Sequence, residues 1–372
     1  MRVEREPGRT VLAGARRGVA CLAVALLGAC AGPGRSAPPA MGPAAPLVVA
    51  LDADPDGAAR EVAERARGAE VVYLGELHDN PAIHVAQAAV LRAMVARGAR
   101  PALAFEMVPE GDQAELTAAV RSAAPADEVG RRLRWAERGW PDFRMYWPLF
   151  ELARRAELAV VAADLDPGLT RQVSRGGLRA VGDAAGRLAS ALPPDPALDR
   201  AIGRRFQAAH CNVLPAARIP AMVDSWFARN VTIARHLRDA LEHAAQVVVI
   251  IGRGHQSPGG VPAQLSALRP GTRQLVVGFV ETDDRGGPDL TDREDTRDVF
   301  WRVPGVDRPD PCRGLMHRLG RSQGMDGLLS GRIAIVTGAA SGIGRAASTP
   351  VTEPSASTAG AGSAPGESRP WP

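Results

Sequence analysis

The sequence predicts an α/β fold: a mostly parallel sheet with helices on both faces. Short runs of apolar residues alternate along the chain with longer stretches of helical spacing, which is the pattern of repeated β-α-β units. The runs at residues 71–76 and 247–251 are apolar almost throughout, as in strands that are buried on both faces of a sheet. Hydrophobic residues make up 45% of the 372, enough to fill the core of such a fold.

Helices separate most of the predicted strands. The stretch at residues 81–96 has helical spacing, begins at Pro81 and ends before Gly98, which are usual start and stop signals. Residues 168–209, broken by Pro193-Pro194, predict an insertion of short helices. The same reasoning places further strands at residues 102–107 and 159–163, and further helices at 110–121, 145–157 and 220–243.

The last two strands differ from the others. Residues 273–281 and 299–303 have strand character, and the charged, glycine-containing stretch at 283–297 between them is expected to be a loop. Because no helical pattern separates the two strands, we expect them to form antiparallel edge strands of the sheet. The α/β domain is therefore expected to cover residues 47–305.

The N-terminus predicts export and a lipid anchor. Residues 1–29 place Arg16-Arg17 before a short apolar stretch, which is typical of a secretory signal peptide and too short to span a bilayer. The ending Leu-Leu-Gly-Ala-Cys resembles a bacterial lipobox, in which Cys30 is acylated and holds the protein at a membrane. Residues 30–46, rich in Pro, Gly and Ala, form a flexible tether.

The predicted location is the bacterial cell envelope. Ala31 stands after Cys30, where an aspartate would favour retention in the inner membrane, so the outer membrane is preferred. The net charge is +4, and residues 1–29 alone hold five arginines and two glutamates. Since no basic patch interleaved with aromatic residues remains, nucleic acid is not an expected partner.

A second motif lies near the C-terminus. After a linker at residues 306–324, the segment 325–347 contains Thr-Gly-Ala-Ala-Ser-Gly-Ile-Gly and resembles the opening of a short-chain dehydrogenase/reductase. A dinucleotide fold needs further strands and helices after this turn, and residues 348–372 are of low complexity. The chain has no lysine for that family's Tyr-x-x-x-Lys pair. We expect a truncated fragment without a working NAD(P) site, followed by a disordered tail.

Two cysteines remain for the folded domain. Cys21 lies in the signal peptide and Cys30 is assigned to lipidation, which leaves Cys211 and Cys312. An oxidising compartment permits these two to pair, but the spacing alone does not decide whether they do.

Candidate functional residues follow three of the predicted strands. Glu76 and His78 end the first strand, Glu106 ends the second, and His255 follows the strand at 247–251 in a repeated Gly-x-x-His pattern. Because the carboxyl ends of parallel strands meet at one edge, the two histidines are expected to face a shared site. A buried Glu106 needs a cation or a proton donor. Such a set can serve acid/base chemistry, metal ligation or capture of a polar ligand, and each histidine alone could be structural.

These residues carry a resemblance to a known family. The motifs at residues 74–80, 104–107 and 252–255, with Gly-Val-Pro at 260–262, are similar to the ChaN-like haem-binding lipoproteins. This family shares a superfamily with the Tiki proteases, TraB-like proteins and erythromycin esterases. The likeness covers roughly residues 45–305 and includes Arg229-Asn230, where the family more usually has Arg-Asp.

The resemblance implies a haem-binding lipoprotein with a role in haem or iron uptake, and a homodimer that stacks two haems. Haem needs an apolar slot, an axial ligand and a cation for its propionates. On this view Tyr146 is the candidate iron ligand, with Trp135, Trp140 and Phe143 beside it. The further candidate haem-binding residues are His78, His255, Arg229, Arg253 and His210.

A hydrolase is the alternative function, with an esterase or protease activity as in other members of the superfamily. Glu76, His78, Glu106 and His255 would then act on a water molecule or hold a divalent metal ion. Both functions use the same pair of Gly-x-x-His motifs, so the sequence leaves open whether the protein is an enzyme.

Overall fold

The computed structural model describes residues 47–50, 53–282, 297–310 and 312–313. Contacts divide the chain between Ala44 and Ala45, and all described residues belong to the second unit. The predicted signal peptide, Cys30 and the tether lie outside the described residues, as do the loop from residue 283 to 296, residues 314–324 of the linker, the dehydrogenase-like segment and the tail.

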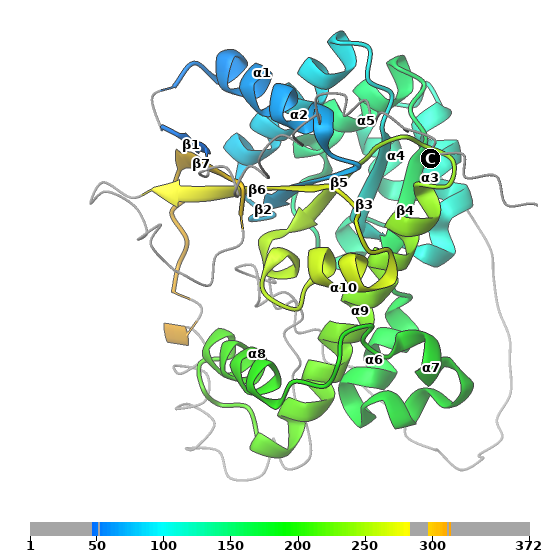
Figure 1. The fold of residues 1–372 in the computed structure, drawn as a ribbon, viewed down its shortest axis with the longest axis vertical. Coiled ribbons are helices and arrows are strands. Elements are labelled where there is room, and N and C mark those ends of the chain that lie inside the picture. Colours follow the sequence, from blue (N-terminus) through cyan, green and yellow to red (C-terminus); the bar gives the residue numbers. More distant parts are fainter. Residues whose placement is uncertain (1–46, 51–52, 283–296, 311, 314–372) are drawn as a thin grey trace, which may run out of the picture. The chain divides into compact units, whose positions relative to one another are not determined.

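A seven-stranded parallel sheet forms the centre of the described unit (Figure 1). The strands lie in the order β1-β7-β6-β2-β5-β3-β4, and every neighbouring pair is parallel. Their bounds are β1 Leu47–Val49, β2 Val71–Glu76, β3 Ala102–Pro109, β4 Val160–Asp164, β5 Val247–Gly252, β6 Gln274–Thr282 and β7 Val299–Pro304. The α/β fold predicted from the sequence is confirmed.

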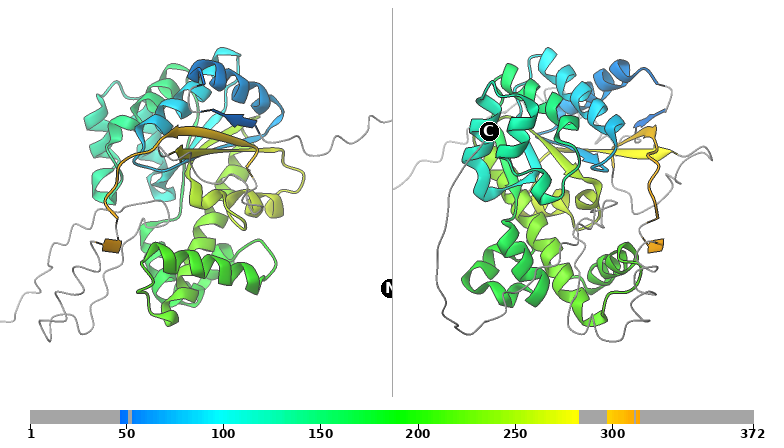
Figure 2. Two further views of the ribbon diagram at one scale, coloured as in Figure 1. Left: turned by 90° about the vertical axis from the view of Figure 1, so that its left-hand side faces the viewer. Right: turned by 180° about the vertical axis from the view of Figure 1, so that it is seen from behind.

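Helices cover both faces of the sheet (Figures 1 and 2). Because side chains alternate between the faces of a strand, β2 sends Val72 and Leu74 into one core and Val71 and Tyr73 into the other. Helices α1 to α5 pack on the first face, and α9 and α10 pack on the second. This double cover explains the unbroken apolar runs of the central strands.

The helices of the described residues are α1 Pro55–Arg65, α2 Pro81–Ala96, α3 Gln113–Arg121, α4 Ala126–Arg132, α5 Trp147–Arg155, α6 Pro167–Gly176, α7 Ala185–Leu188, α8 Pro196–Ala209, α9 Ile219–Ala240 and α10 Val261–Leu268. Helices α6, α7 and α8 form the predicted helical insertion between β4 and α9. None of the described helices has both the length and the apolar character needed to cross a membrane.

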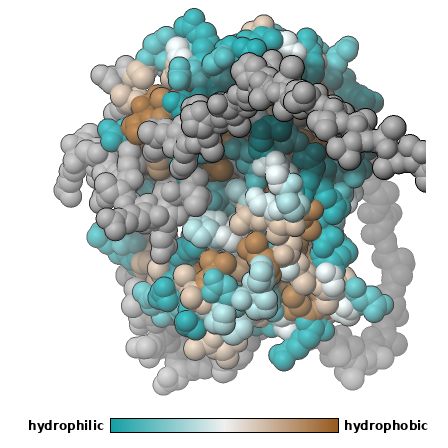
Figure 3. Space-filling view, viewed as in Figure 1, coloured by the Kyte–Doolittle hydropathy of each residue, from teal (hydrophilic) through white to brown (hydrophobic). Residues whose placement is uncertain are grey.

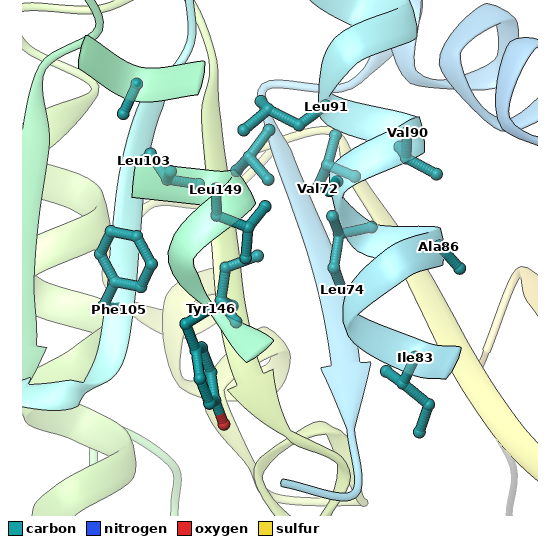
Figure 4. Close-up of a cluster of buried hydrophobic side chains, with 14 of the residues drawn as sticks. Val72, Leu74, Ile83, Ala86, Val90, Leu91, Leu103, Phe105, Tyr146 and Leu149 are labelled. Carbon is teal, nitrogen blue, oxygen red and sulfur yellow. The ribbon is translucent and has the colours of Figure 1, made fainter. Parts of the chain in front are cut away.

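The core beneath α2 and α5 reaches the edge where the strands end. Figure 4 shows Leu74 of β2 against α2, with Tyr146 at the start of α5 on the other side of the strand. The ring of Tyr146 lies in this core, and its hydroxyl points along the strand direction toward the carboxyl edge. The packing of α5 therefore carries a polar atom to the place where the predicted site residues gather.

The predicted antiparallel edge is wrong. Strand β7 pairs with both β6 and β1 in parallel, with Gly278 opposite Phe300 and Leu47 opposite Val299. A hairpin commonly uses a turn of about two to five residues, whereas parallel strands need a connection of about a dozen or more. The chain between Thr282 and Val299 is long enough for a parallel connection. The length of this connection therefore indicates the direction of β7, whereas the absence of a helical pattern does not.

Four shorter elements were not predicted: β1, α1, α4 and α10. Strand β1 has three residues, and the residues that α1 buries are Ala59, Val62 and Ala63, two of them alanine. Its start is nevertheless marked in the sequence, because the Asp54 side chain accepts hydrogen bonds from Asp56 N and Gly57 N. Capping residues were therefore a better guide here than hydrophobic spacing.

Cys211 and Cys312 form a disulfide, with their Cα atoms 5.3 Å apart. The bond answers the question that the sequence left open. It joins the turn after α8, in the helical insertion, to the chain that follows β7 (Figure 2).

The surface shows apolar patches over the helical insertion, in the lower half of Figure 3. A hollow of about 260 Å³ lies there between α8 and α9, lined in part by Leu198, Val223 and Phe227. Another hollow, of about 520 Å³, lies against Val120 and Leu158. Neither hollow is lined by the predicted site residues.

Candidate functional site

The carboxyl ends of three neighbouring strands bring the predicted residues together. Glu76 ends β2 opposite Gly252 of β5, and Glu106 lies in β3 on the other side of β5. A Cβ atom on Gly252 would lie 2.9 Å from His78 Nε2 and 3.2 Å from Glu106 Oε2. The predicted convergence of the strand ends on one site is therefore confirmed, and glycine at 252 leaves room for it.

Glu76 organises the first half of the site. Its Oε1 lies 2.7 Å from His78 Nδ1 and accepts a hydrogen bond of 2.6 Å from the Tyr146 hydroxyl. Its Oε2 accepts a hydrogen bond of 2.7 Å from Gln87 Nε2. Glu76 and Tyr146 are fully buried, and His78 is 7% exposed.

A second layer from α2 fixes these groups. Gln87 also donates to the Leu74 carbonyl at 3.1 Å, and His84 Nε2 lies 2.9 Å from the His78 carbonyl oxygen. His84 Nδ1 lies 3.1 Å from Gln87 Oε1. Both side chains are buried, so α2 holds the carboxylate and the backbone of His78 in a single orientation.

Glu106 organises the second half. Its Oε1 accepts a hydrogen bond of 2.9 Å from Arg229 Nη2 and lies 3.1 Å from His255 Nε2. Its Oε2 accepts from the Gly252 N–H. Arg229 also binds Asp164 with both Nε and Nη2, at 2.9 and 2.8 Å. The cation that a buried Glu106 requires is thus supplied by α9.

The two Gly-x-x-His histidines have different surroundings. His255 uses both ring nitrogens, because Nδ1 lies 3.0 Å from Asn230 Oδ1 while Nε2 faces Glu106. Asn230 is buried and donates its amide to the Trp226 carbonyl at 2.6 Å. His78 uses only Nδ1 in this way: within the described part of the chain, its Nε2 has no hydrogen-bond partner.

Electrostatics keep both carboxylates ionised. Burial alone would raise the pKa of Glu76, but His84, His78 and Tyr146 together hold it below its ordinary value. Burial opposes ionisation of Glu106 as well, and His255 and Arg229 bring its pKa well below the ordinary value.

The same charges act on the neighbours of Glu76. Burial would lower the pKa of His78, but the bond to Glu76 and the nearby Glu106 raise it overall. Burial and the adjacent Glu76 raise the pKa of Tyr146 well above its ordinary value, so the phenol keeps its proton. A protonated, fully buried Tyr146 that donates to Glu76 is arranged as part of the His78 support, and its role as an iron ligand stays a prediction.

The predicted aromatic residues divide into two groups. The Trp140 ring lies beside His78, with ring centroids 4.8 Å apart, and donates its indole N–H to the Met107 carbonyl at 3.0 Å. Trp135 and Phe143 pack against each other at 5.0 Å inside the core. Of these three described rings, Trp140 is the one that lies directly beside His78.

The cationic residues predicted for the site also lie in different surroundings. Arg229 is committed to Glu106 and Asp164, whereas Arg253, directly after β5, is exposed and has no hydrogen bond or ion pair to any described residue. His210 lies at the end of α8, where its Nδ1 faces the Phe206 carbonyl at 2.8 Å. In the described structure no hydrogen bond or ion pair links His210 to the strand-end network.

Sequence reasoning missed Asp164, His84 and Gln87 as members of the site. Asp164 ends its strand in the same way as Glu76, so its position was a usable signal. His84 and Gln87 lie three residues apart on the apolar side of a predicted helix, where a polar side chain needs a partner. No group of three or more His, Cys, Asp and Glu side chains among the described residues is arranged to hold a metal ion.

Comparison with known proteins agrees with the motifs. Residues 62–265 match the family described as haem-binding uptake, Tiki superfamily, ChaN. The chain belongs to this family. The resemblance seen in the sequence is confirmed, and family membership supports a haem-related function. A search of curated proteins found no match.

Several solved structures are similar in fold. ChaN of Campylobacter jejuni, described with cofacial haem binding, has 18% identity over 61% of this chain and 88% of that chain, with a TM-score of 0.49. The type III effector HopBA1 has 18% identity over 68% of this chain and 96% of that chain, with a TM-score of 0.40. An erythromycin esterase, EreC, has 13% identity over 59% and 72%, with a TM-score of 0.36.

Proposed function

We propose that the protein binds haem at the carboxyl edge of the sheet, with His78 Nε2 as the axial ligand. The observation that carries this proposal is the arrangement of His78: a carboxylate holds Nδ1, and Nε2 is left without a partner beside the Trp140 ring. A carboxylate on the far nitrogen orients a ligating imidazole and raises its basicity. Family membership supports haem as the bound group.

The remaining requirements of haem are met by residues nearby. Arg253 is an exposed cation without a described partner at the end of β5, which suits it to a propionate carboxylate. Arg229 is already shared between Glu106 and Asp164, so its part is to hold the network and not the propionates. The Trp140 ring supplies an apolar surface on which a porphyrin can lie.

The proposal includes a cellular role and an anchor. The N-terminal motif supports acylation of Cys30, attachment to the envelope and preference for the outer membrane, where a haem-binding lipoprotein would serve uptake of haem or iron. The resemblance of the sequence to the ChaN-like family implies a homodimer that stacks two haems, so a haem-linked homodimer is part of the proposal.

A hemin titration of the full chain tests the ligand. We expect a sharpened, red-shifted Soret band that His78→Ala abolishes or shifts and that added imidazole restores. His243→Ala is the matched control, since His243 is exposed at the end of α9, and it should leave the spectrum unchanged. Tyr146→Phe separates the two ligand assignments, because a tyrosine-ligated iron would change its spectrum in this variant and not in His78→Ala.

Two further results bear on the function as a whole. Sedimentation with and without hemin should show dimer formation only in the loaded protein. A chain that leaves the hemin spectrum unchanged and instead holds a stoichiometric divalent metal would contradict haem binding and favour the hydrolase alternative.

A further inference from the structure

A segment that follows β7 connects the site edge to the helical insertion. We call residues 305–310 together with Cys312 the strap. Figures 1 and 2 show this orange segment running from the end of β7 toward α8, away from the sheet. It is fixed at two points, one ionic and one covalent.

The ionic attachment lies next to His78, the proposed haem ligand. Arg308 Nε and Nη2 donate to the two carboxylate oxygens of Asp79 at 2.7 and 2.6 Å. Nη1 and Nη2 also donate to Glu281 at 2.6 and 2.8 Å. Asp79 directly follows His78 in the chain, so the strap is clamped to the loop that presents the His78 ring.

The covalent attachment is the disulfide. Cys312 is bonded to Cys211, immediately after α8, and the Asp310 side chain accepts from the Cys312 N–H at 2.8 Å. The strap therefore bridges the carboxyl edge of the sheet and the helical insertion. The chain itself joins these two parts where β4 leads into α6 and where α9 leads into β5, and the disulfide adds a connection separate from both.

The backbone at the disulfide is unusual. Cys211 and Asn212 both have φ of 58°, a left-handed conformation that non-glycine residues rarely adopt and that surrounding structure must enforce. Close by, His210 Nε2 and Gln207 Oε1 are buried without a hydrogen-bond partner in the described part of the chain. The turn is held both by its own backbone hydrogen bonds, from Cys211 N to the Ala208 carbonyl at 3.0 Å and from Asn212 N to the Gln207 carbonyl at 2.7 Å, and by the disulfide.

We propose that the Cys211–Cys312 disulfide is a redox-modification site that takes a dithiol, and that its reduction releases the strap from the helical insertion. Both cysteines are partly exposed, and access is what exchange with a dithiol requires. One thiolate of the dithiol attacks a sulfur of the bond and forms a mixed disulfide, and the other thiolate resolves it. The dithiol leaves as a disulfide, and Cys211 and Cys312 are left as two thiols.

The strap also bears on the site, a step that rests on the proposed haem function. With the bond intact, the chain that clamps Asp79 is fixed to the helical insertion at its other end. After reduction only the Arg308 clamp remains, and it joins the strap to the sheet alone. The helical insertion is then free of the strap, and a bound haem should leave faster.

The experiment uses the full chain, oxidised or treated with dithiothreitol, and measures amide hydrogen exchange in residues 211–213, beside the disulfide, and at Gly305 of the strap. The N–H groups of these residues donate backbone hydrogen bonds, and we expect their exchange to rise by about tenfold or more on reduction, because local opening sets the exchange rate. The Cys211→Ser/Cys312→Ser double variant should exchange fast in both conditions. A disulfide that resists dithiothreitol until the chain unfolds, or equal exchange before and after reduction, would overturn the proposal.

Haem release is the second readout. Transfer of bound haem to apomyoglobin should be about tenfold faster from the reduced chain, a change equivalent to about 1.4 kcal/mol in the barrier. The double variant should release haem at the fast rate whether or not dithiothreitol is present. If the chain binds no hemin at all, the proposed function is wrong, and hydrogen exchange alone then tests whether reduction releases the strap. If exchange increases on reduction while the rate of haem transfer stays the same, the strap does not control haem release.

Discussion

Two histidines that look alike in the sequence have separate chemical roles. His255 is satisfied at both ring nitrogens by Glu106 and Asn230 and ties β5 to α9. His78 is satisfied at one nitrogen and leaves the other available. The repeated Gly-x-x-His pattern predicted where both would lie, but only the partners of each ring show that His255 is engaged at both nitrogens and that His78 Nε2 has no partner among the described residues.

Among the residues of the site, removing the charge of Glu106 should lower the free energy of unfolding the most. Glu106→Gln leaves its oxygen positions filled but removes the charge that faces Arg229 and His255 in a buried setting, at an expected loss of about 3 kcal/mol in the free energy of unfolding. Urea denaturation measures this loss. Glu115→Gln, which breaks the more exposed pair with Arg132, is the control and should leave stability unchanged within error. Equal effects in the two variants would contradict the role of burial.

The same charge gives the stability a pH dependence. The pKa of Glu106 is well below its ordinary value of 4.5 in the folded chain, so its contribution is complete above that value and is lost as the pH falls toward the folded pKa. The Glu106→Gln variant should show a shallower loss of stability below about pH 4.5 than the unmodified chain. If stability falls equally steeply with decreasing pH in the two proteins, carboxylates other than Glu106 determine the loss of stability in acid.

At the scale of elements, strand ends and helix starts could be read from the sequence, while contacts between distant elements could not. Helix α2 begins and ends as predicted, because Asn80 and Pro81 mark its start. The second-layer bonds from Gln87 and His84 were not predicted, since they depend on how α2 is rotated against β2. Burial of polar side chains on an apolar face is the sequence signal for such contacts.

Asn80 combines a helix cap with a link between elements. Its Oδ1 accepts from Ala82 N at 2.9 Å, and its Nδ2 donates to Glu281 at 2.6 Å and to the Pro304 carbonyl at 2.9 Å. Asn80→Ala should therefore cost about 2–3 kcal/mol, the cap plus the buried bonds that are lost. The matched variant Asp54→Ala removes the cap of α1 and an exposed ion pair with Arg60, which contributes little, and should cost about 1 kcal/mol. Thermal unfolding of both variants compares them, and equal shifts would show that the links to Glu281 and Pro304 contribute nothing.

At the scale of the molecule, the fold class, the two helical layers and the meeting of strand ends followed from patterning, and the direction of β7 did not. The apolar pattern of a strand predicts which face of the sheet each residue occupies. The direction of a strand depends instead on the end of the sheet from which the connecting chain enters it. The order β1-β7-β6 places β7 between two strands that are far apart in sequence, which no local pattern encodes. The Cys211–Cys312 bond likewise depends on the placement of the helical insertion.

The dehydrogenase-like motif at residues 325–347 should not bind a dinucleotide. A working site needs the strand before the glycine-rich turn to join a sheet that also contributes the following strands and an acidic ribose partner. In the described part of the chain, the sheet is built from strands between Leu47 and Pro304, with β1 and β4 at its edges. After Gly344 the sequence offers no further apolar run of strand length and no lysine.

Titration of the full chain with NADH or NADPH, followed by cofactor fluorescence, should therefore show no saturable binding. Deletion of residues 314–372 should leave hemin binding and the midpoint of unfolding unchanged. The Gly338→Ala variant is the control for any weak signal, since it would reduce binding only if the turn held the pyrophosphate. Micromolar affinity that is lost on deletion and weakened by this variant would instead make the C-terminal segment a functional dinucleotide site.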